Sequence, residues 1–266
     1  MTPQSTYKLA LNDIAVVITS ALYVDKLGQS LNSIDPFRLQ RLQQTIAAIL
    51  TFKFTKIIVL DASLTDDFVA PTTTGAKIDF VQIKSTLHKH PNEYQVYGPS
   101  RLEIDLMANA QATLNQLLAG YTHIIKLSAG YSVGNLDVIL ARASSGVVYR
   151  FGNPLRRKVR FCLSSFYILP TAEFLSFISY AAGKIDMVTK KYPLEAVLFD
   201  FIQTLKTRSI AIDYPIINAT FLSSQTNSNN SSFKIKLKIY QVLASLGLYA
   251  RAVGEIKDYT KSFRDE

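Results

Sequence analysis

The chain has 266 residues, of which 48% are hydrophobic, and it carries a formal net charge of +9. This length and hydrophobic content are sufficient for one large or two small folded domains and exclude a largely disordered chain. The single cysteine, Cys162, excludes an intrachain disulfide framework and fits a reducing compartment, and the basic balance favours an anionic partner such as a nucleotide, a nucleic acid or an acidic lipid surface.

The start of the chain and its hydropathy favour a protein that is soluble or peripheral to a membrane. Asp13 precedes the first apolar run, which lacks the basic segment and long apolar core of a signal peptide. No apolar stretch reaches the roughly 18 residues that suggest a spanning helix. The histidines, His88, His90 and His123, offer no zinc-ligand spacing, so we predict no metal site from them.

The N-terminal part of the chain predicts a strand, a helix and a second strand. IAVVITSALY, which begins at Ile14, is rich in β-branched residues and indicates a buried strand with small polar side chains at its end. The segment PFRLQRLQQTIAAILTF has apolar residues at helical spacing, and Pro36 is placed to open this helix. KIIVLDAS, Lys56 to Ser63, is the next buried strand. Together they form a βαβ unit, which implies two parallel strands with a right-handed crossover.

The middle of the chain predicts a strand, a long helix and another strand. Residues 77–85 alternate in the manner of a strand. Residues 100–120 form the expected helix, opened by a capping box of Ser100 and Glu103 and closed by Gly120. HIIKL then supplies a fourth strand.

The later part of the chain predicts more strands and helices, then a polar linker and a basic tail. GVVYRF and VRFCLSSFYIL indicate two strands that form a hairpin across GNPLRRK, TAEFLSFISYAAG and PLEAVLFDFIQTL indicate helices, and AIDYPIIN indicates a last strand. Residues 223–232 are polar and without periodicity, as in a loop or linker. Residues 233–266 predict one or two basic amphipathic helices that lie on an anionic membrane surface, on the main domain or at an oligomer contact. We therefore expect one α/β domain, residues 1–222, with a mostly parallel central sheet flanked by helices, followed by a helical extension.

Polar side chains follow the predicted strands at their carboxyl ends, where ligands of open α/β sheets bind. These residues are Thr19 and Ser20, Asp61 to Ser63, and Ser128 to Tyr131. Asp61 either accepts hydrogen bonds from a ribose or a base amide, or caps a turn through its own backbone. Neither GxGxxG nor GxxxxGK[ST] is present, so NAD and P-loop chemistry lack their usual support.

A series of segments in a fixed order carries a resemblance to a known family. The segments are VVITSALY, RLQQTIAAIL, KIIVLDAS, a Glu-bearing helix, HIIKLSAGYSVGN, a strand pair ending in FYILP, and PLEAVLFDFI. This order resembles a group of bacterial and viral GT-A-type glycosyltransferases, over roughly residues 14–202. In that group the strand after the long helix ends in a Lys-Ile-Ser/Thr-Gly-Arg-Tyr type motif with an Asn four residues on. The matching residues here are Lys126, Ser128, Tyr131 and Asn135.

The resemblance implies a nucleotide-sugar donor as co-substrate and no other cofactor. The nucleoside would lie over the ends of the first two strands, and the diphosphate and sugar near residues 126–131. The residues expected to bind the donor are Thr19, Ser20, Arg41, Asp61, Ala62, Arg101, Lys126, Ser128, Ala129, Gly130 and Tyr131. Many GT-A enzymes hold a divalent metal through an Asp-x-Asp motif, and this chain has Ser128, Ala129 and Gly130 in that place. A metal would need phosphates, water or a carboxylate from elsewhere, so we predict metal-independent transfer.

Without a metal, cationic side chains or backbone amides must stabilise the leaving diphosphate. The candidate cations are Arg41, Arg101, Lys126 and the cluster of Arg156, Arg157, Lys158 and Arg160, and the cluster is equally consistent with solvated surface charge. The family's arginine before the tyrosine is missing, because Gly130 occupies its place.

An inverting transfer also needs a general base for the acceptor hydroxyl. Glu195, at the start of the helix in YPLEAVLFDFI, is the predicted catalytic residue, and the alternative is an ordinary first-turn Glu that complements the helix dipole. Glu103 matches a glutamate of the family, and Glu103, Asn135 and Tyr167 are the expected contacts to the acceptor or the sugar.

The predicted function is therefore sugar transfer from a nucleotide-sugar to a glycan or lipid-linked acceptor, in surface polysaccharide synthesis, in the cytoplasm or at the inner face of a membrane. The absent Asp-x-Asp and the missing arginine leave a non-catalytic nucleotide-sugar or glycan-binding relative as an alternative. The acidic strand end in VLDAS supports a Rossmann-like methyltransferase as a further alternative. The chain lacks the glycine-rich turn after the first strand that such cofactor sites usually need. Nucleic-acid binding rests on charge alone and is not predicted.

Overall fold

The fold is seen in a computed structural model of the chain. The residues that the structure describes are 9–22, 34–62, 78–83, 99–134, 136–142, 148–150, 164–189, 192–205, 210–212 and 217–218. The predicted linker and tail, the basic cluster at residues 156–160, and Asn135 lie outside these ranges.

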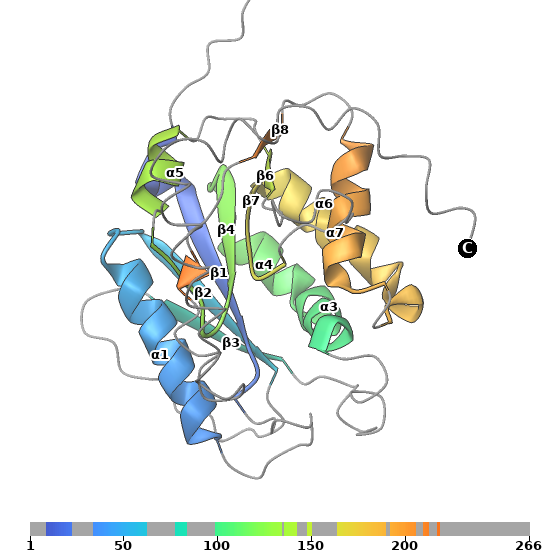
Figure 1. Ribbon diagram of the computed structural model, residues 1–266, viewed down its shortest axis with the longest axis horizontal. Helices are drawn as coiled ribbons and strands as arrows, with labels where there is room; N and C mark the ends of the chain where they lie inside the picture. The colour runs from blue at the N-terminus through green and yellow to red at the C-terminus, as the bar shows by residue number, and fades with distance from the viewer. Residues whose placement is uncertain are drawn as a thin grey trace, which may run out of the picture.

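The described chain is an α/β fold around a seven-stranded sheet with the order β3-β2-β1-β4-β7-β6-β8 (Figure 1). The strands are β1 (Ile14–Ser20), β2 (Lys56–Ala62), β3 (Ile78–Ile83), β4 (His123–Ser128), β6 (Val148–Arg150), β7 (Phe166–Pro170) and β8 (Ile210–Ile212). Strands β3, β2, β1 and β4 are parallel to one another, and β7 runs antiparallel to both β4 and β6. The expected mostly parallel sheet and the pairing of the two strands around Arg150 and Phe166 are confirmed, and the predicted connection between these strands lies outside the described residues.

Helices cover both faces of the sheet (Figure 1). The elements α1 (Pro36–Leu50) and α5 (Leu136–Arg142) pack on one face, and α3 (Pro99–Asn109), α4 (Gln111–Leu117), α6 (Thr171–Ala182) and α7 (Leu194–Thr204) pack on the other. Successive strand residues alternate between the two cores, so Val16 packs with the α1 side and Val17 with the α3 side. Short 3₁₀ turns, η1 (Leu11–Asp13) and η3 (Ile185–Met187), complete this part of the fold.

Helix α1 begins where the sequence predicts. Pro36 is its first residue, and the Asp35 carboxylate accepts hydrogen bonds from the backbone N–H groups of Phe37 and Arg38 at 2.8 and 3.3 Å. This cap satisfies donors that the first helical turn leaves without an internal partner.

The predicted single helix over residues 100–120 is wrong in two respects. It is interrupted at Ala110 into α3 and α4, although the bonds from the Ala110 N–H to Leu106 and from the Leu114 N–H to Ala110 continue across the break. Helix α3 begins at Pro99, so Ser100 lies within its first turn and is not the N-cap. The carboxylate of Glu103 is turned toward the sheet, where an ion pair and hydroxyl donors hold it in place of a capping box.

Two other elements differ from the prediction. AIDYPIIN forms two short strands in different sheets: β8 joins the main sheet, and β9 (Ile217–Asn218) pairs with β5 (Ser132–Val133). The short helix α5 is unpredicted, because seven residues carry too little periodicity to identify it. No helix within the described ranges is long and apolar enough to cross a membrane.

Candidate functional site

The polar strand ends lie together at one edge of the sheet. In the parallel register Thr19 lies opposite Ser128, and Ser20 lies opposite Asp61. Thr19, Lys126 and Ser128 fall on the face covered by α3 and α7, because residues two apart in a strand share a face. The sheet itself therefore brings the residues of the first and fourth strands into one polar group.

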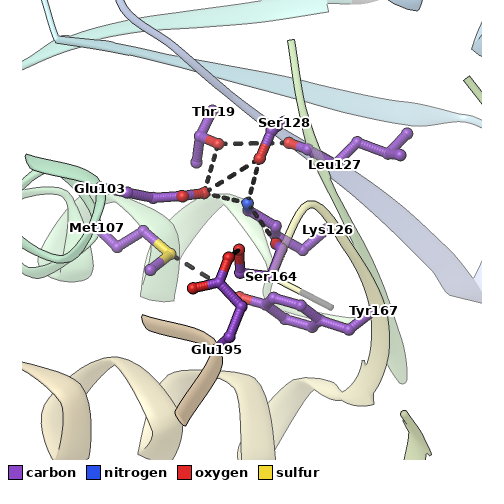
Figure 2. A network of polar contacts seen from close by, with 9 residues as sticks. All are labelled: Thr19, Glu103, Met107, Lys126, Leu127, Ser128, Ser164, Tyr167 and Glu195. Carbon is purple, nitrogen blue, oxygen red and sulfur yellow. Dashed lines mark hydrogen bonds and ion pairs between the residues drawn. The ribbon is translucent and has the colours of Figure 1, made fainter. Parts of the chain in front are cut away.

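A buried lysine forms the centre of this group (Figure 2). Lys126 is completely buried and forms an ion pair with Glu103 of α3. Its ammonium also donates to the Ser128 hydroxyl at 2.7 Å and to the Ser164 carbonyl at 2.8 Å. These three partners use all three N–H donors of a lysine, so the buried charge is both paired and fully hydrogen-bonded.

Glu103 is held by one of its two carboxylate oxygens. Oε1 pairs with Lys126 and accepts from the hydroxyls of Thr19, at 2.8 Å, and Ser128, at 3.4 Å. Oε2 has no hydrogen-bond partner among the residues that the structure describes, and the side chain is 17% exposed. Oε2 is therefore the oxygen that a hydroxyl of a ligand could reach.

Glu195 is joined to the same group through Ser164, a residue that the sequence interpretation missed. Glu195 lies in the first turn of α7, and its Oε1 accepts a hydrogen bond of 2.6 Å from the Ser164 hydroxyl (Figure 2). The backbone carbonyl of Ser164 accepts from Lys126. The available signal was the pair of serines that interrupts the apolar run FCLSSFYIL just before β7.

Lys126 and Tyr167, two of the predicted ligand contacts, are buried and contact other residues of the protein instead. Lys126 has no exposed surface and no remaining donor, so its expected contact with the donor phosphates is not available in this arrangement. Tyr167 lies opposite Lys126 on β7, is fully buried, and has its hydroxyl 4.0 Å from the sulfur of Met107. Burial raises the pKa of the Tyr167 hydroxyl well above its ordinary value. Its ring, 5.8 Å from Lys126 Nζ, packs beside the ammonium in place of the expected acceptor contact.

The backbone N–H groups of the turn after β4 are already hydrogen-bonded within the protein. The N–H of Ala129 donates to the Thr19 carbonyl at 2.9 Å, that of Gly130 to the Thr45 hydroxyl at 2.9 Å, and that of Tyr131 to the Ser128 carbonyl at 3.3 Å. Thr45 comes from α1, so this helix fixes the turn from the other face of the sheet. These three amides are engaged within the protein and are therefore not available to a diphosphate in this arrangement.

Gly130 leaves room for an arginine from another element. Its φ of +91° is a backbone conformation that favours glycine, and a Cβ added there would lie 2.2 Å from Arg41 Nε. Arg41 belongs to α1, its guanidinium lies 5.7 Å from the Phe37 ring centroid, and burial lowers its pKa from the ordinary value. Arg41 thus occupies the space where a side chain at position 130 would begin.

Gly130→Ala should therefore destabilise the protein by more than Gly120→Ala. Both glycines have left-handed backbone angles, +91° and +90°, which cost an L-residue roughly 1–2 kcal/mol. Nothing lies within 4 Å of a Cβ at Gly120, whereas the Arg41 guanidinium must move for one at Gly130. Urea unfolding of the two variants measures the difference, and equal losses would show that the Arg41 contact contributes nothing.

The other predicted donor-binding residues have structural partners or little exposure. Asp61 is 1% exposed and accepts a hydrogen bond of 3.0 Å from the backbone N–H of Leu22, just after β1, so this bond holds a neighbouring segment and is not a cap on a turn of its own backbone. Arg101, in the first turn of α3, pairs with Asp186 at 3.3 Å. Ser20 and Ala62 are buried beside Asp61, and Ala129 and Tyr131 are half-buried.

The chemistry available to this group is proton acceptance by carboxylates. The Ser128 hydroxyl lies 2.7 Å from Lys126 Nζ, which is the spacing of an enzyme in which a lysine base activates a serine nucleophile. Lys126 is engaged as a three-donor ammonium, however, and such a group has no lone pair to accept a proton. Glu103 and Glu195 remain as acceptors, each with one oxygen anchored.

Within the described ranges, no group of three or more His, Cys, Asp or Glu side chains is placed to hold a metal ion. The sequence matches no protein-family model, and a search of curated proteins finds no match to it. The geometry of the strand-end group is therefore the main basis for a functional proposal.

Proposed function

We propose that the protein transfers a sugar from a nucleotide-sugar donor to a hydroxyl of a glycan or lipid-linked acceptor. The observation that supports this most strongly is the pair of carboxylates, Glu103 and Glu195, joined through Lys126 and Ser164 at the carboxyl ends of parallel strands. This edge is where open α/β sheets bind nucleotides and their derivatives. The resemblance of the sequence to GT-A-type glycosyltransferases is the reason for choosing a nucleotide-sugar among such ligands.

In the proposed reaction Glu195 acts as the general base. Its carboxylate takes the proton of the acceptor hydroxyl, the acceptor oxygen bonds to the anomeric carbon, and the nucleoside diphosphate leaves with the electron pair of the broken bond. Attack from the face opposite the leaving group inverts the anomeric configuration. Glu103 Oε2 accepts a hydrogen bond from a sugar hydroxyl, because its partner oxygen is already fixed.

The leaving diphosphate is stabilised by side chains in this proposal. Lys126 and the amides of the turn after β4 are engaged elsewhere, so Arg41 and Arg101 are the described cations that serve this role. No step of the proposed reaction requires a metal. The basic tail would bring the protein to an anionic membrane surface, at the inner face, where a lipid-linked acceptor lies.

A non-catalytic nucleotide-sugar or glycan-binding protein is the second candidate. The engagement of Lys126 and of the turn amides favours it, since both are then withheld from charge that develops in a transition state. Such a protein would bind the donor with the same residues and release it unchanged. Product analysis after incubation with the donor and a mixture of acceptor glycans distinguishes the two candidates.

Thermal-shift measurements against UDP-, GDP-, CMP- and dTDP-sugars, with and without Mn²⁺, test the binding step. We expect one nucleotide class to raise Tm without metal, because ligand binding to the native state stabilises it by mass action. S-adenosylmethionine serves as the comparison for a methyltransferase. Stabilisation only in the presence of Mn²⁺ would overturn metal independence, and stabilisation by S-adenosylmethionine alone would overturn the proposal.

A further inference from the structure

We infer that Ser164 is a positioning residue that fixes Glu195 beside the buried Glu103–Lys126 pair. This inference deepens the proposed function and rests on the role given there to Glu195. Ser164 is 7% exposed, and it contacts the two halves of the site with different groups: its carbonyl accepts from Lys126, and its hydroxyl donates to Glu195.

The backbone at Ser164 is held in place by hydrogen bonds from β4. Lys126 Nζ donates to the Ser164 carbonyl at 2.8 Å, and the Ser128 N–H donates to the carbonyl of the next residue, Ser165, at 3.0 Å. Strand β7 begins directly after Ser165 and pairs with β4. The position of the Ser164 hydroxyl is therefore set by the same strand that carries Lys126 and Ser128.

The hydroxyl then restrains one oxygen of Glu195. The separation of 2.6 Å is typical of a hydroxyl that donates to an ionised carboxylate. The carboxylate of Glu195 has no other hydrogen bond within the described part of the chain, and its side chain is only half-buried. Without the Ser164 hydroxyl, nothing described would hold the carboxylate in this orientation. With it, the second oxygen of Glu195 stays available for a proton from the acceptor.

The contacts thus form a continuous series of an ion pair and hydrogen bonds, from Glu103 through Lys126 and Ser164 to Glu195 (Figure 2). The two carboxylates come from different helices, α3 and α7, which pack in the same core, and the Ser164 contact fixes the orientation of the Glu195 carboxylate relative to Glu103. A catalytic group that is displaced by about 1 Å can lose on the order of 100-fold in rate. Ser164 is accordingly the residue whose removal should affect turnover without affecting the donor contacts.

Ser164→Ala tests the inference, with Ser165→Ala as the matched control. The hydroxyl of Ser165 makes no hydrogen bond within the described ranges, and only its carbonyl is used. We expect Ser164→Ala to lower kcat roughly 10- to 100-fold with donor KM unchanged, and its crystal structure to show the Glu195 carboxylate rotated away. Ser165→Ala should keep the kcat of the wild type. Ser164→Cys, which fills the same space with a weak donor, should give an intermediate kcat.

Wild-type kcat in both Ser164 variants, or an unmoved Glu195 carboxylate in the Ser164→Ala structure, would overturn the inference. A wild-type protein that transfers no sugar from any donor would instead overturn the proposed function. In that event the crystal structure of Ser164→Ala still decides whether Ser164 orients Glu195. The two failures are therefore distinguishable.

Discussion

Glu103→Gln is expected to destabilise the protein by about 3 kcal/mol, because it leaves the ammonium of Lys126 buried without its counter-charge. The glutamine side chain keeps the shape of the glutamate that it replaces, so the loss would report charge and not packing. The remaining partners of Lys126, the Ser128 hydroxyl and the Ser164 carbonyl, are neutral and cannot replace a carboxylate. Urea unfolding at constant pH and ionic strength measures the effect.

Substitution of the other partner, Lys126, should reduce the free energy of unfolding by less. Lys126→Met removes the buried charge, and its unbranched side chain can pack on the Tyr167 ring, although the Ser164 carbonyl loses its donor. Glu103, at 17% exposure, keeps the hydroxyl donors of Thr19 and Ser128 and part of its hydration. We expect a loss of about 2 kcal/mol, because the Ser164 carbonyl loses its donor, and recovery of part of the Glu103→Gln loss in the double variant, since neither residue then carries a buried charge. Additive losses in the double variant would contradict this account of the pair.

Glu195→Gln is expected to lower kcat by about 10²- to 10⁴-fold, the range that a general base typically contributes. The substitution keeps an acceptor for the Ser164 hydroxyl and removes the basic carboxylate. Its effect on stability should stay within about 1 kcal/mol, the usual value of an acidic residue in a first helical turn. Initial rates at saturating donor, with the unfolding free energy measured in parallel, separate the two effects.

Asp137→Asn is the matched control for Glu195→Gln. Asp137 is an exposed acidic residue in the first turn of α5, so its loss reproduces the helix-dipole term alone. We expect a small loss of stability and unchanged kcat. If Glu195→Gln behaves in the same way as Asp137→Asn, then Glu195 is an ordinary first-turn residue and the base assignment is wrong.

Much of the fold follows from local sequence patterns. The β-branched runs that begin at Ile14 and Lys56 indicate buried strands, and Pro36 marks the start of α1. The strand-helix-strand order predicts the parallel pairing of β1 with β2, which brings Ser20 beside Asp61. These features depend on periodicity and chain order, which a single sequence contains.

The internal organisation of the site could not be predicted in the same way. From the sequence, Lys126 and Glu103 are expected to contact a ligand, and only the packing of α3 on the sheet shows that they pair with each other. Ser164 acquires its role from the antiparallel pairing of β7 with β4, a contact between distant parts of the chain. The place of Arg41 against Gly130 likewise depends on how α1 packs. Tertiary contacts of this kind leave no local pattern.

The proposed donor site is tested most directly by a crystal structure of the protein with the nucleotide-sugar that stabilises it most. We expect the donor at the carboxyl ends of β1, β2 and β4, with a sugar hydroxyl within hydrogen-bond distance of Glu103 Oε2 and the anomeric carbon on the side of Glu195. A donor bound elsewhere on the molecule, or bound with both carboxylates remote from the sugar, would contradict it.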